Sequence, residues 1–280
     1  MSKNIEITIR NQIAMVALNR PEIRNAFDDT LIAELTKTFR RLDADKSVRA
    51  VVLMGNGPAF CAGADLNWMK RMAGYNEEQN LEDARALAAM LRTLDRLGKP
   101  TIARVHGPAF AGGVGLVAAC DIAFGSTEAE FCLTEVKLGL TPATISPYVV
   151  RAMGERAARR YFLSGERFTA AEAYRLGLLS DLAQPGELDN AINALLGHIV
   201  TGGSAAQAEI KDLIRAVSRG PVSDAMIEDT ARRIAKVRVS PEGREGITSF
   251  LEKRKPAWVA RPAAGAEPVA KGARQNPKKK

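Results

Sequence analysis

Residues 102–139 read IARVHGPAFAGGVGLVAACDIAFGSTEAEFCLTEVKLG, and this stretch decides the fold. A short apolar run leads into a loop with glycines at 107, 112, 113 and 115. A helix of small residues follows, and then two strand-like pieces, the second of which is expected to end in a carboxylate, Glu135. Glycines packed this densely before a helix allow backbone N–H groups to approach a bound group closely. The stretch therefore predicts a binding loop.

A second loop of small residues, FCAGADL at 60–66, occurs at an equivalent place in the chain. Each loop follows an apolar strand, predicted over 49–54 and over 101–105, and each precedes a helix. An amphipathic helix predicted over 79–97 connects the two units. The sequence therefore repeats a strand-and-helix unit without repeating its letters.

The flanking regions predict a hairpin at one end and helices at the other. Residues 5–9 and 13–18 alternate apolar and polar side chains around Asn11 and Gln12, and Asp28 caps a helix that follows. Thr169 to Glu172 forms a capping box, its helix ends at Gly177, and 178–182 is a short strand. We expect a mixed α/β core over 1–200 and a helical region over 201–258. A helix is predicted to begin at 149, and further helices are predicted at 187–200, 204–218, 222–237 and 241–253.

Composition restricts the class of protein. With 46% hydrophobic and 26% charged residues, the 280-residue chain resembles an ordinary globular protein. From residue 259 onward there are six Lys or Arg and one Glu, so +5 of the net charge of +8 belongs to a tail and +3 to the body. We expect residues 259–280 to be a disordered basic tail. The start of the chain has no apolar signal segment, and no apolar run is long enough to span a membrane. Cys61, Cys120 and Cys132 are interpreted as buried thiols in a reducing compartment. A cytoplasmic location is therefore predicted.

Three interpretations of the glycine loop compete. Gly113, Gly115 and Ala118 match a dinucleotide fingerprint with Glu135 downstream, but a seven-residue loop separates the strand from the first of these glycines. A purely structural tight turn does not account for the matching loop at 60–66. Two loops that each contribute a backbone donor are what an oxyanion hole requires, and a nearby glutamate can then move protons. Neither of the two histidines is expected to be catalytic, since His106 is interpreted as structural and His198 as a surface residue.

Several motifs also carry a resemblance that covers about residues 5–258. They are Arg20-Pro21 with Asn25-Ala26, residues 60–66, Gly107 with Ala111-Gly112-Gly113, Cys120-Asp121-Ile122-Ala123, and Phe131 with Glu135 and Leu138-Gly139. Together they resemble the crotonase (enoyl-CoA hydratase/isomerase) superfamily. The resemblance implies a spiral of strand–strand–helix turns, a C-terminal helical region that builds a homotrimer or a hexamer, and a coenzyme A thioester as substrate. It implies no metal and no cofactor beyond the coenzyme A of the substrate.

The resemblance also implies roles for individual residues. The backbone N–H groups of Ala64 and Gly112 match the family's oxyanion donors, and Glu135 matches its proton-transferring glutamate. Substrate-binding positions carried over in the same way are Arg24, Ala62, Ala64, Asp65, Leu66, Gly112 and Lys253, the last reaching the coenzyme A of a neighbouring subunit.

One position departs from the family pattern. Typical hydratases carry another glutamate three residues after the oxyanion glycine, where this chain has Gly115. A single carboxylate suffices to shuttle a proton between C2 and C4, so a 3,2-enoyl-CoA isomerase is one alternative. Finer similarity, which includes 67–69, 135–148 and 154–161, is to bacterial methylglutaconyl-CoA and isohexenylglutaconyl-CoA hydratases, and it favours hydration of a branched or dicarboxylic 2-enoyl-CoA in leucine, isoprenoid or fatty-acid degradation.

A more remote alternative is RNA binding, which one member of the family is known to perform. The basic residues of the predicted helix over 31–49 would carry it: Lys37, Arg40, Arg41, Lys46 and Arg49. The same positions are typical of an ordinary solvated helix face, so we expect no specific nucleic-acid partner.

Overall fold

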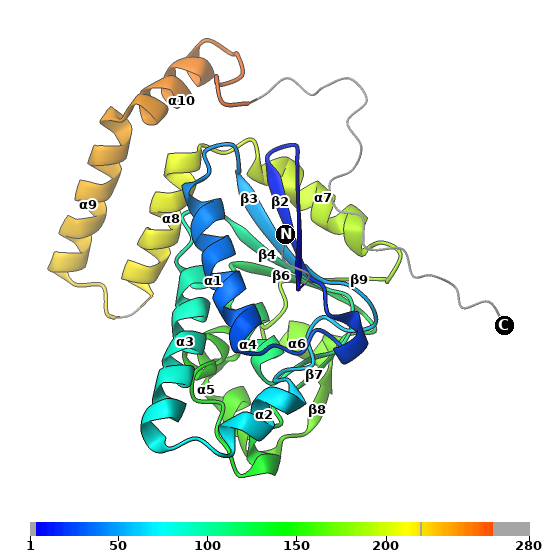
Figure 1. Cartoon of the computed structure of the whole chain (residues 1–280). Helices are drawn as coiled ribbons and strands as arrows, with labels where there is room; N and C mark the ends of the chain where they lie inside the picture. The colour runs from blue at the N-terminus through cyan, green and yellow to red at the C-terminus, as the bar shows by residue number, and fades with distance from the viewer. Residues whose placement is uncertain (1–3, 219, 260–280) are drawn as a thin grey trace.

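The fold is built around a six-stranded sheet whose strands follow the order of the chain. The computed structural model describes residues 4–218 and 220–259. Its main sheet has the order β1-β2-β3-β4-β6-β9 (Figure 1). The pair β1–β2 is antiparallel and the other neighbours are parallel. The bounds are β1 Ile5–Arg10, β2 Ile13–Leu18, β3 Ala50–Gly55, β4 Thr101–Val105, β6 Ile122–Ser126 and β9 Asp181–Ala183.

A smaller layer of extended chain accompanies this sheet. Its strands are β5 (Ala109–Phe110), β7 (Glu130–Cys132) and β8 (Arg167–Thr169). Single parallel bridges extend the layer, joining Cys61 to Ala109 and Phe27 to Ala64. Successive turns of the chain therefore each contribute one strand to the main sheet and one short extended piece to the smaller layer. This is the predicted spiral, and it places the two small-residue loops side by side.

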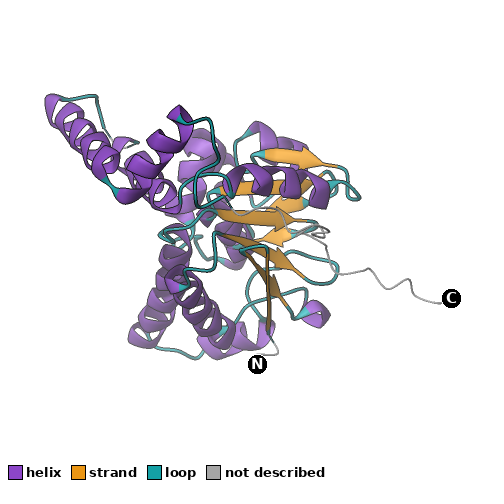
Figure 2. Cartoon of the chain, turned by 90° about the horizontal axis from the view of Figure 1, so that it is seen from above, coloured by secondary structure: helices purple, strands orange, loops and turns teal. Residues whose placement is uncertain are grey.

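Both faces of the main sheet are buried. Val16 and Leu18 of β2 belong to the core under α1, α3, α4 and α5, whereas Met15 and Ala17 face α7. Strands buried on both faces lose the apolar–polar alternation of a half-exposed sheet, which is why residues 50–54 are a continuous apolar run. Figure 2 shows helices on both sides of the strands. Their bounds are α1 Asp29–Ala44, α3 Glu77–Asp95, α4 Gly112–Ala119, α5 Ser146–Ser164 and α7 Leu188–Ile199.

Local signals explain most of the helix boundaries. Asp28 accepts a hydrogen bond from the N–H of Leu31 and caps α1, as predicted. Asn76 forms a capping box that starts α3 at Glu77. Thr169 caps α6 (Ala170–Arg175), but the carboxylate of Glu172 binds Arg175 instead of closing the predicted box. The remaining short elements are η1 (Pro21–Ile23), α2 (Leu66–Met72) and η2 (Glu135–Leu138).

Helices α8 (Ser204–Val217), α9 (Asp224–Val239) and α10 (Pro241–Leu251) form an arm, and α9 and α10 stand away from the body (Figure 1). Lys211 of α8 anchors the arm, since its ammonium lies 2.6 Å from the Asp121 carboxylate. The Glu242 carboxylate accepts hydrogen bonds from the first N–H groups of α8 and ties α10 back to it. The arm exposes many apolar side chains: Ile210, Ile214, Val217, Val222, Ile227, Ile234, Val239, Ile247, Phe250 and Leu251.

Some predicted boundaries were wrong. The strand predicted at 178–182 is β9 at Asp181–Ala183, because Leu178 and Leu179 pack into the core before the strand begins. The helix predicted over 31–49 ends at Ala44, and Arg49 leads into β3 as a buried residue that binds the carbonyl of Gly202. Of the predicted basic tail, residues 260–280 lie outside the described residues.

Candidate active site

Backbone hydrogen bonds hold the two small-residue loops together. The N–H groups of Phe60 and Cys61 donate to the Pro108 carbonyl at 3.0 and 3.2 Å, and the Phe110 N–H donates to the Cys61 carbonyl at 2.9 Å. Gly63 has a φ of +93°, and a Cβ at this position would lie 3.1 Å from the Phe110 carbonyl oxygen. The loops are therefore in backbone contact where the sequence predicted only that they occupy equivalent places in the chain.

The two predicted oxyanion donors both have free hydrogens. Among the described residues, no acceptor receives the N–H of Ala64 or the N–H of Gly112. Gly112 is the first residue of α4, so its N–H belongs to the set of donors that a helix leaves unpaired at its N-terminus. The N–H of Ala64 lacks a partner, although the N–H of Asp65 next to it donates to the Phe27 carbonyl. Unpaired donors in two adjacent loops are the arrangement that can stabilise a developing oxyanion.

Phe27 links the two donors, and nothing in the sequence pointed to it. Its N–H donates to the Gly63 carbonyl at 2.8 Å and its carbonyl accepts from the Asp65 N–H at 3.0 Å, so its backbone holds the residues on both sides of Ala64. Its ring packs against Gly112, where an added Cβ would lie 2.1 Å from the ring Cζ. Phe27 is 2% exposed, which leaves its ring little room to move.

Ala111 turns the chain into α4 with an unusual backbone conformation. It has a φ of 48° and a ψ of −118°, a region that favours glycine. Its N–H donates to the Cys132 carbonyl at 2.8 Å, which ties the turn to β7. The strained residue thus directly precedes the unpaired N–H of Gly112.

Glu135 lies on the segment that follows β7. It lies three residues beyond Cys132, the residue whose carbonyl holds Ala111. It begins the short helix η2, so the expectation that it ends a strand was wrong. Its Oε2 atom is buried and has no hydrogen-bond partner among the described residues. Burial raises the pKa of this carboxyl above its usual range, which suits a group that must take and return a proton.

The space at Gly115 is filled by another residue. A Cβ added to Gly115 would lie 2.3 Å from Cγ2 of Ile145 and 2.8 Å from its Cβ. Ile145 is 2% exposed and directly precedes α5. The family's additional carboxylate is thus absent, and an aliphatic side chain occupies the place from which it would project.

The remaining predicted site residues differ in their placement. The Asp65 carboxylate accepts hydrogen bonds from the N–H groups of Asn67 and Trp68 and so caps α2. Its second oxygen lies 3.6 Å from the Arg20 guanidinium, so the carboxylate has a structural role. Leu66 is 73% exposed at the start of α2. Arg24 is exposed and makes no ion pair within the described part of the chain. The Ala62 N–H donates to the Arg24 carbonyl at 2.9 Å, so these two residues lie together.

Lys253 follows α10, and the arm that carries α10 stands away from the body (Figure 1). Its contact with a neighbouring subunit stays a prediction. The Nε2–H of His106 donates a hydrogen bond to the Gly57 carbonyl at 2.9 Å, as expected of a structural histidine. Cys61 and Cys132 are buried, Cys120 is half-buried, and all three are free thiols.

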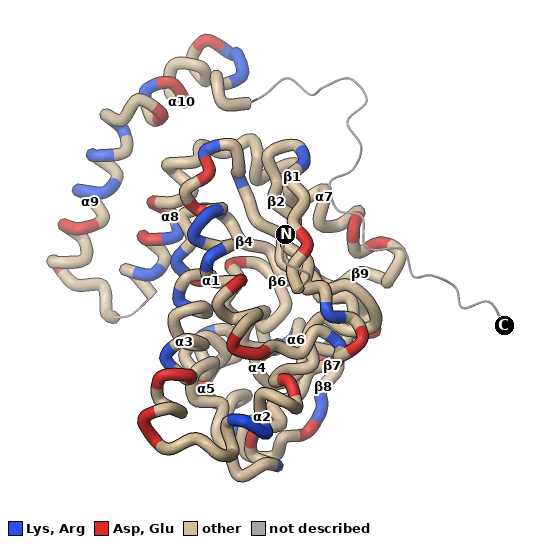
Figure 3. The backbone as a smooth tube through the Cα atoms, viewed as in Figure 1, with Lys and Arg blue, Asp and Glu red and all other residues tan. Residues whose placement is uncertain are grey.

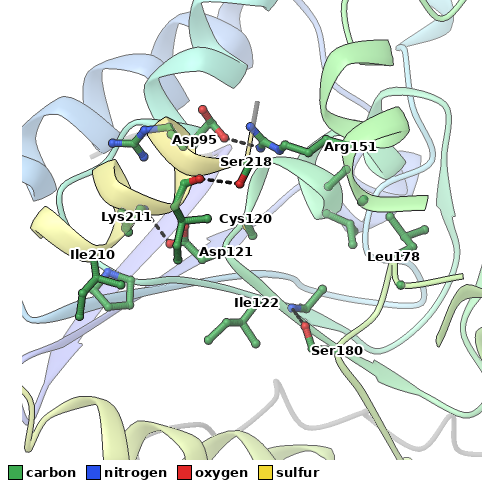
Figure 4. A pocket seen from close by; sticks show the side chains of 18 of the residues that line it. Asp95, Cys120, Asp121, Ile122, Arg151, Leu178, Ser180, Ile210, Lys211 and Ser218 are labelled. Carbon is green, nitrogen blue, oxygen red and sulfur yellow. Dashed lines mark hydrogen bonds and ion pairs between the residues drawn. The ribbon is translucent and has the colours of Figure 1, made fainter. Parts of the chain in front are cut away.

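A cavity of about 590 Å³ lies at the opposite end of α4 from Gly112. The C-terminal residues of α4 and the inner face of α8 line it, and Figure 4 shows the Lys211–Asp121 and Arg151–Asp95 pairs at its walls. Two buried polar atoms that belong to its lining residues, Oε1 of Gln207 and Nε of Arg215, have no described partner. None of the predicted site residues lines this cavity, so it is separate from the oxyanion loops.

The basic residues considered for RNA binding lie among acidic ones in the described part of the chain. Figure 3 shows acidic residues interspersed with basic ones along α1, α8 and α9. Arg49, one of the five basic residues considered for RNA, is 6% exposed and bound to Gly202. Within residues 4–218 and 220–259, no helix is long and apolar enough to cross a membrane, and no group of three or more His, Cys, Asp or Glu residues is arranged to hold a metal ion.

Comparison with known proteins identifies the family of the chain. A family model described as enoyl-CoA hydratase/isomerase matches residues 8–261. A Thermus thermophilus protein, whose enoyl-CoA hydratase name is provisional, is 37% identical over 249 residues that cover 89% of this chain and 98% of its own. The short-chain-enoyl-CoA hydratase of Clostridium acetobutylicum is 31% identical and is matched over 90% of this chain and 96% of its own. The crystal structure of an enoyl-CoA hydratase from Shewanella pealeana has a TM-score of 0.89 at 42% identity and is matched over 91% of this chain and 96% of its own.

Proposed function

Because the chain belongs to the enoyl-CoA hydratase/isomerase family, we propose that it adds water to the double bond of a 2-enoyl-CoA thioester. One observation carries the proposal. The backbone N–H groups of Ala64 and Gly112 are unpaired and lie in two loops that are in contact. The segment that is hydrogen-bonded to the second loop also carries Glu135, which has a buried carboxylate oxygen without a described partner. This arrangement suits a reaction in which negative charge develops on a carbonyl oxygen while a proton moves nearby.

In the proposed mechanism the two N–H groups donate to the thioester oxygen and draw electrons away from C3. Glu135 takes a proton from a water molecule whose oxygen bonds to C3, and an enolate forms under the oxyanion donors. Glu135 then returns its proton to C2. Since one carboxylate serves both steps, the oxygen and the proton add to the same face of the double bond. The raised pKa of the Glu135 carboxyl makes it a better base than an exposed glutamate and an adequate acid afterwards.

A second candidate is 3,2-enoyl-CoA isomerisation. The filled space over Gly115 favours it, because Ile145 leaves no position for another carboxylate there and one carboxylate can carry a proton from C2 to C4. We rank hydration first because of the finer sequence similarity to the methylglutaconyl-CoA and isohexenylglutaconyl-CoA hydratases. The proposed acyl group is therefore branched or dicarboxylic, as in 3-methylglutaconyl-CoA.

We also propose that the active form is a homotrimer or a hexamer. The arm supports this proposal. No described side chain of α9 is buried, and Ile227, Ile234 and Val239 are exposed on it. Apolar surface of this extent usually marks an interface with another chain. Equilibrium sedimentation is the measurement, and a monomer at micromolar concentration would contradict the proposal.

The function is tested by supplying crotonyl-CoA, 3-methylglutaconyl-CoA and a 3-enoyl-CoA separately to the full chain. Hydration removes the absorbance of the conjugated enoyl thioester, whereas isomerisation of the 3-enoyl compound creates it. We expect loss of absorbance with the first two substrates. A gain with the 3-enoyl compound and no loss with the others would favour the isomerase, and no change with any of them would refute both activities for these acyl groups.

A further inference from the structure

Phe27 fixes the direction of the Ala64 N–H group through the backbone. Its N–H donates to the Gly63 carbonyl at 2.8 Å, and its carbonyl accepts from the Asp65 N–H at 3.0 Å. The Gly63 carbonyl and the Ala64 N–H belong to one peptide unit, which is planar and trans, so the two groups point in opposite directions. The hydrogen bond from Phe27 on one side of this unit therefore directs the Ala64 N–H to the other side.

The ring of Phe27 supports the first residue of α4. An ideal Cβ on Gly112 would lie 2.1 Å from the ring Cζ atom, 2.7 Å from Cε1 and 3.2 Å from Cε2. Since Cζ is the nearest of the three, Gly112 rests on the tip of the ring. The backbone of Phe27 pairs with Ala64 in a parallel bridge. The length of the Phe27 side chain therefore sets the separation between Ala64 and Gly112.

The ring is itself held in place by its neighbours. Phe27 is 2% exposed, and Trp68, which is 3% exposed, packs against it with ring centroids 6.0 Å apart. The Trp68 N–H donates to the Asp65 carboxylate at 3.0 Å, and its indole Nε1–H donates to Asp83 at 3.1 Å. A buried ring among close-packed neighbours has little freedom to move. The side chain is thus a rigid spacer between the loop at 60–66 and the start of α4.

We propose that Phe27 is a positioning residue that sets both the spacing and the direction of the two donors. This inference rests on the proposed function, in which the N–H groups of Ala64 and Gly112 bind one thioester oxygen. Two donors serve one oxygen only when both lie within hydrogen-bond distance of the place where its charge develops. A spacer of fixed length meets this condition before the substrate binds, so the donors need no reorganisation during the reaction.

A shorter and a longer side chain at position 27 test the spacer. Phe27→Leu removes Cζ and both Cε atoms, whereas Phe27→Tyr keeps the ring and adds a hydroxyl group at Cζ, the atom nearest Gly112. Both are expected to lower kcat with crotonyl-CoA by about 10²-fold, the cost of misplacing reacting groups by about 1 Å. Affinity for butanoyl-CoA, measured by calorimetry, should change far less, because the donors matter most when charge develops.

Phe39→Leu is the matched control. Phe39 is fully buried in the same core, and it lies ten residues beyond the first residue of α1, about 15 Å along the helix. The substitution removes the same atoms from the same kind of environment. It should lower the melting temperature as Phe27→Leu does, and it should keep the kcat of the wild type.

The carbonyl stretching frequency of a bound thioester reports on the donors without any turnover. Hydrogen bonds to a carbonyl oxygen weaken its C=O bond and lower this frequency. The probe is butanoyl-CoA labelled with carbon-13 at its thioester carbonyl, measured by infrared difference spectroscopy. Wild-type and Phe39→Leu protein should lower its frequency equally below that of the free compound in water. In Phe27→Leu and Phe27→Tyr the frequency should return toward the value of the free compound.

A double variant tests the contact between the ring and Gly112. Leucine at position 27 lacks the three ring atoms that a Cβ on Gly112 would meet. Phe27→Leu with Gly112→Ala should therefore have a higher kcat than Gly112→Ala alone. Coupling of this kind is expected for residues in contact. Losses in kcat that simply multiply would show that the ring does not set the position of Gly112.

The outcomes separate failure of this inference from failure of the proposed function. Folded Phe27→Leu and Phe27→Tyr proteins with the kcat and the carbonyl frequency of the wild type would overturn the inference, even if both were less stable. Wild-type protein that binds the probe without lowering its frequency would overturn it as well. Wild-type protein that lowers the frequency but hydrates no substrate would count against the proposed function alone, and the frequencies of the Phe27 variants would still decide the inference.

Discussion

Substituting Gly112 by alanine tests the oxyanion site at its tightest contact. The new Cβ would lie 2.1 Å from Cζ and 2.7 Å from Cε1 of the Phe27 ring. The ring cannot move away cheaply, because Phe27 is 2% exposed and packs against Trp68 with ring centroids 6.0 Å apart. The N-terminus of α4 must therefore shift, and the Gly112 N–H moves with it.

The magnitude of the loss follows from two known effects. Overpacking of this kind costs about 1–3 kcal/mol of folding free energy. Misplacing one oxyanion donor costs about 10²–10³ in kcat. We therefore expect a modest fall in melting temperature and a fall in kcat of about two to three orders of magnitude, with affinity for a saturated acyl-CoA changed far less.

Steady-state kinetics with crotonyl-CoA and calorimetry with butanoyl-CoA measure the two quantities. Gly186→Ala is the control, since a Cβ there meets nothing within 4 Å. A folded Gly112→Ala protein with the kcat of the wild type would refute the assignment of its N–H as a donor. Equal losses in kcat and in analogue affinity would show that the loop binds the substrate without favouring the transition state.

Three further predictions follow from individual residues. Ala111→Gly should keep kcat and leave the melting temperature equal or higher, because glycine adopts a φ of 48° without strain; a clear loss of stability would contradict the strained turn. Glu135→Gln should raise the melting temperature near pH 8 and not near pH 4: a raised pKa stabilises the fold below the ordinary glutamate value of about 4.3, and this stabilisation is lost as the pH rises through the folded value. A constant difference across that range would exclude a buried charge. Lys211→Met should lower the free energy of unfolding in urea by about 2 kcal/mol, because it leaves the Asp121 carboxylate without its ammonium partner; Lys236→Met, at an exposed pair, is the control and should change little. Equal effects would contradict the anchoring role of Lys211.

The sequence was most informative where the chemistry is local. The turn at Asn11 and Gln12 has positive φ at both residues, as a two-residue hairpin requires, and Asp28 caps α1 as its position indicated. These features depend on the residues within one turn of them, so a sequence can predict them without knowledge of the fold. The family motifs extended this to the overall spiral, which the solved structures of relatives match.

Contacts between distant residues were not predictable in the same way. Phe27 lies 85 positions before Gly112 and Ile145 lies 30 positions after Gly115, and an isolated apolar residue gives no indication of the glycine that it covers. The boundary of β9 was missed because Leu178 and Leu179 are apolar, as strand residues often are, but they are buried in the core before the strand begins. The absence of a carboxylate at 115 was visible in the sequence, whereas the residue that fills its place was visible only in the structure.

The central claim is that Glu135 moves the proton while backbone donors hold the thioester, and Glu135→Gln tests it most directly. The substitution keeps the shape of the side chain and removes the base. The measurement is the rate of loss of the enoyl absorbance with wild-type and Glu135→Gln protein, each first shown to bind butanoyl-CoA with equal affinity. The account predicts a fall of at least about 10²-fold, the lower range for a general acid–base. Hydration by Glu135→Gln at the rate of the wild type would contradict it.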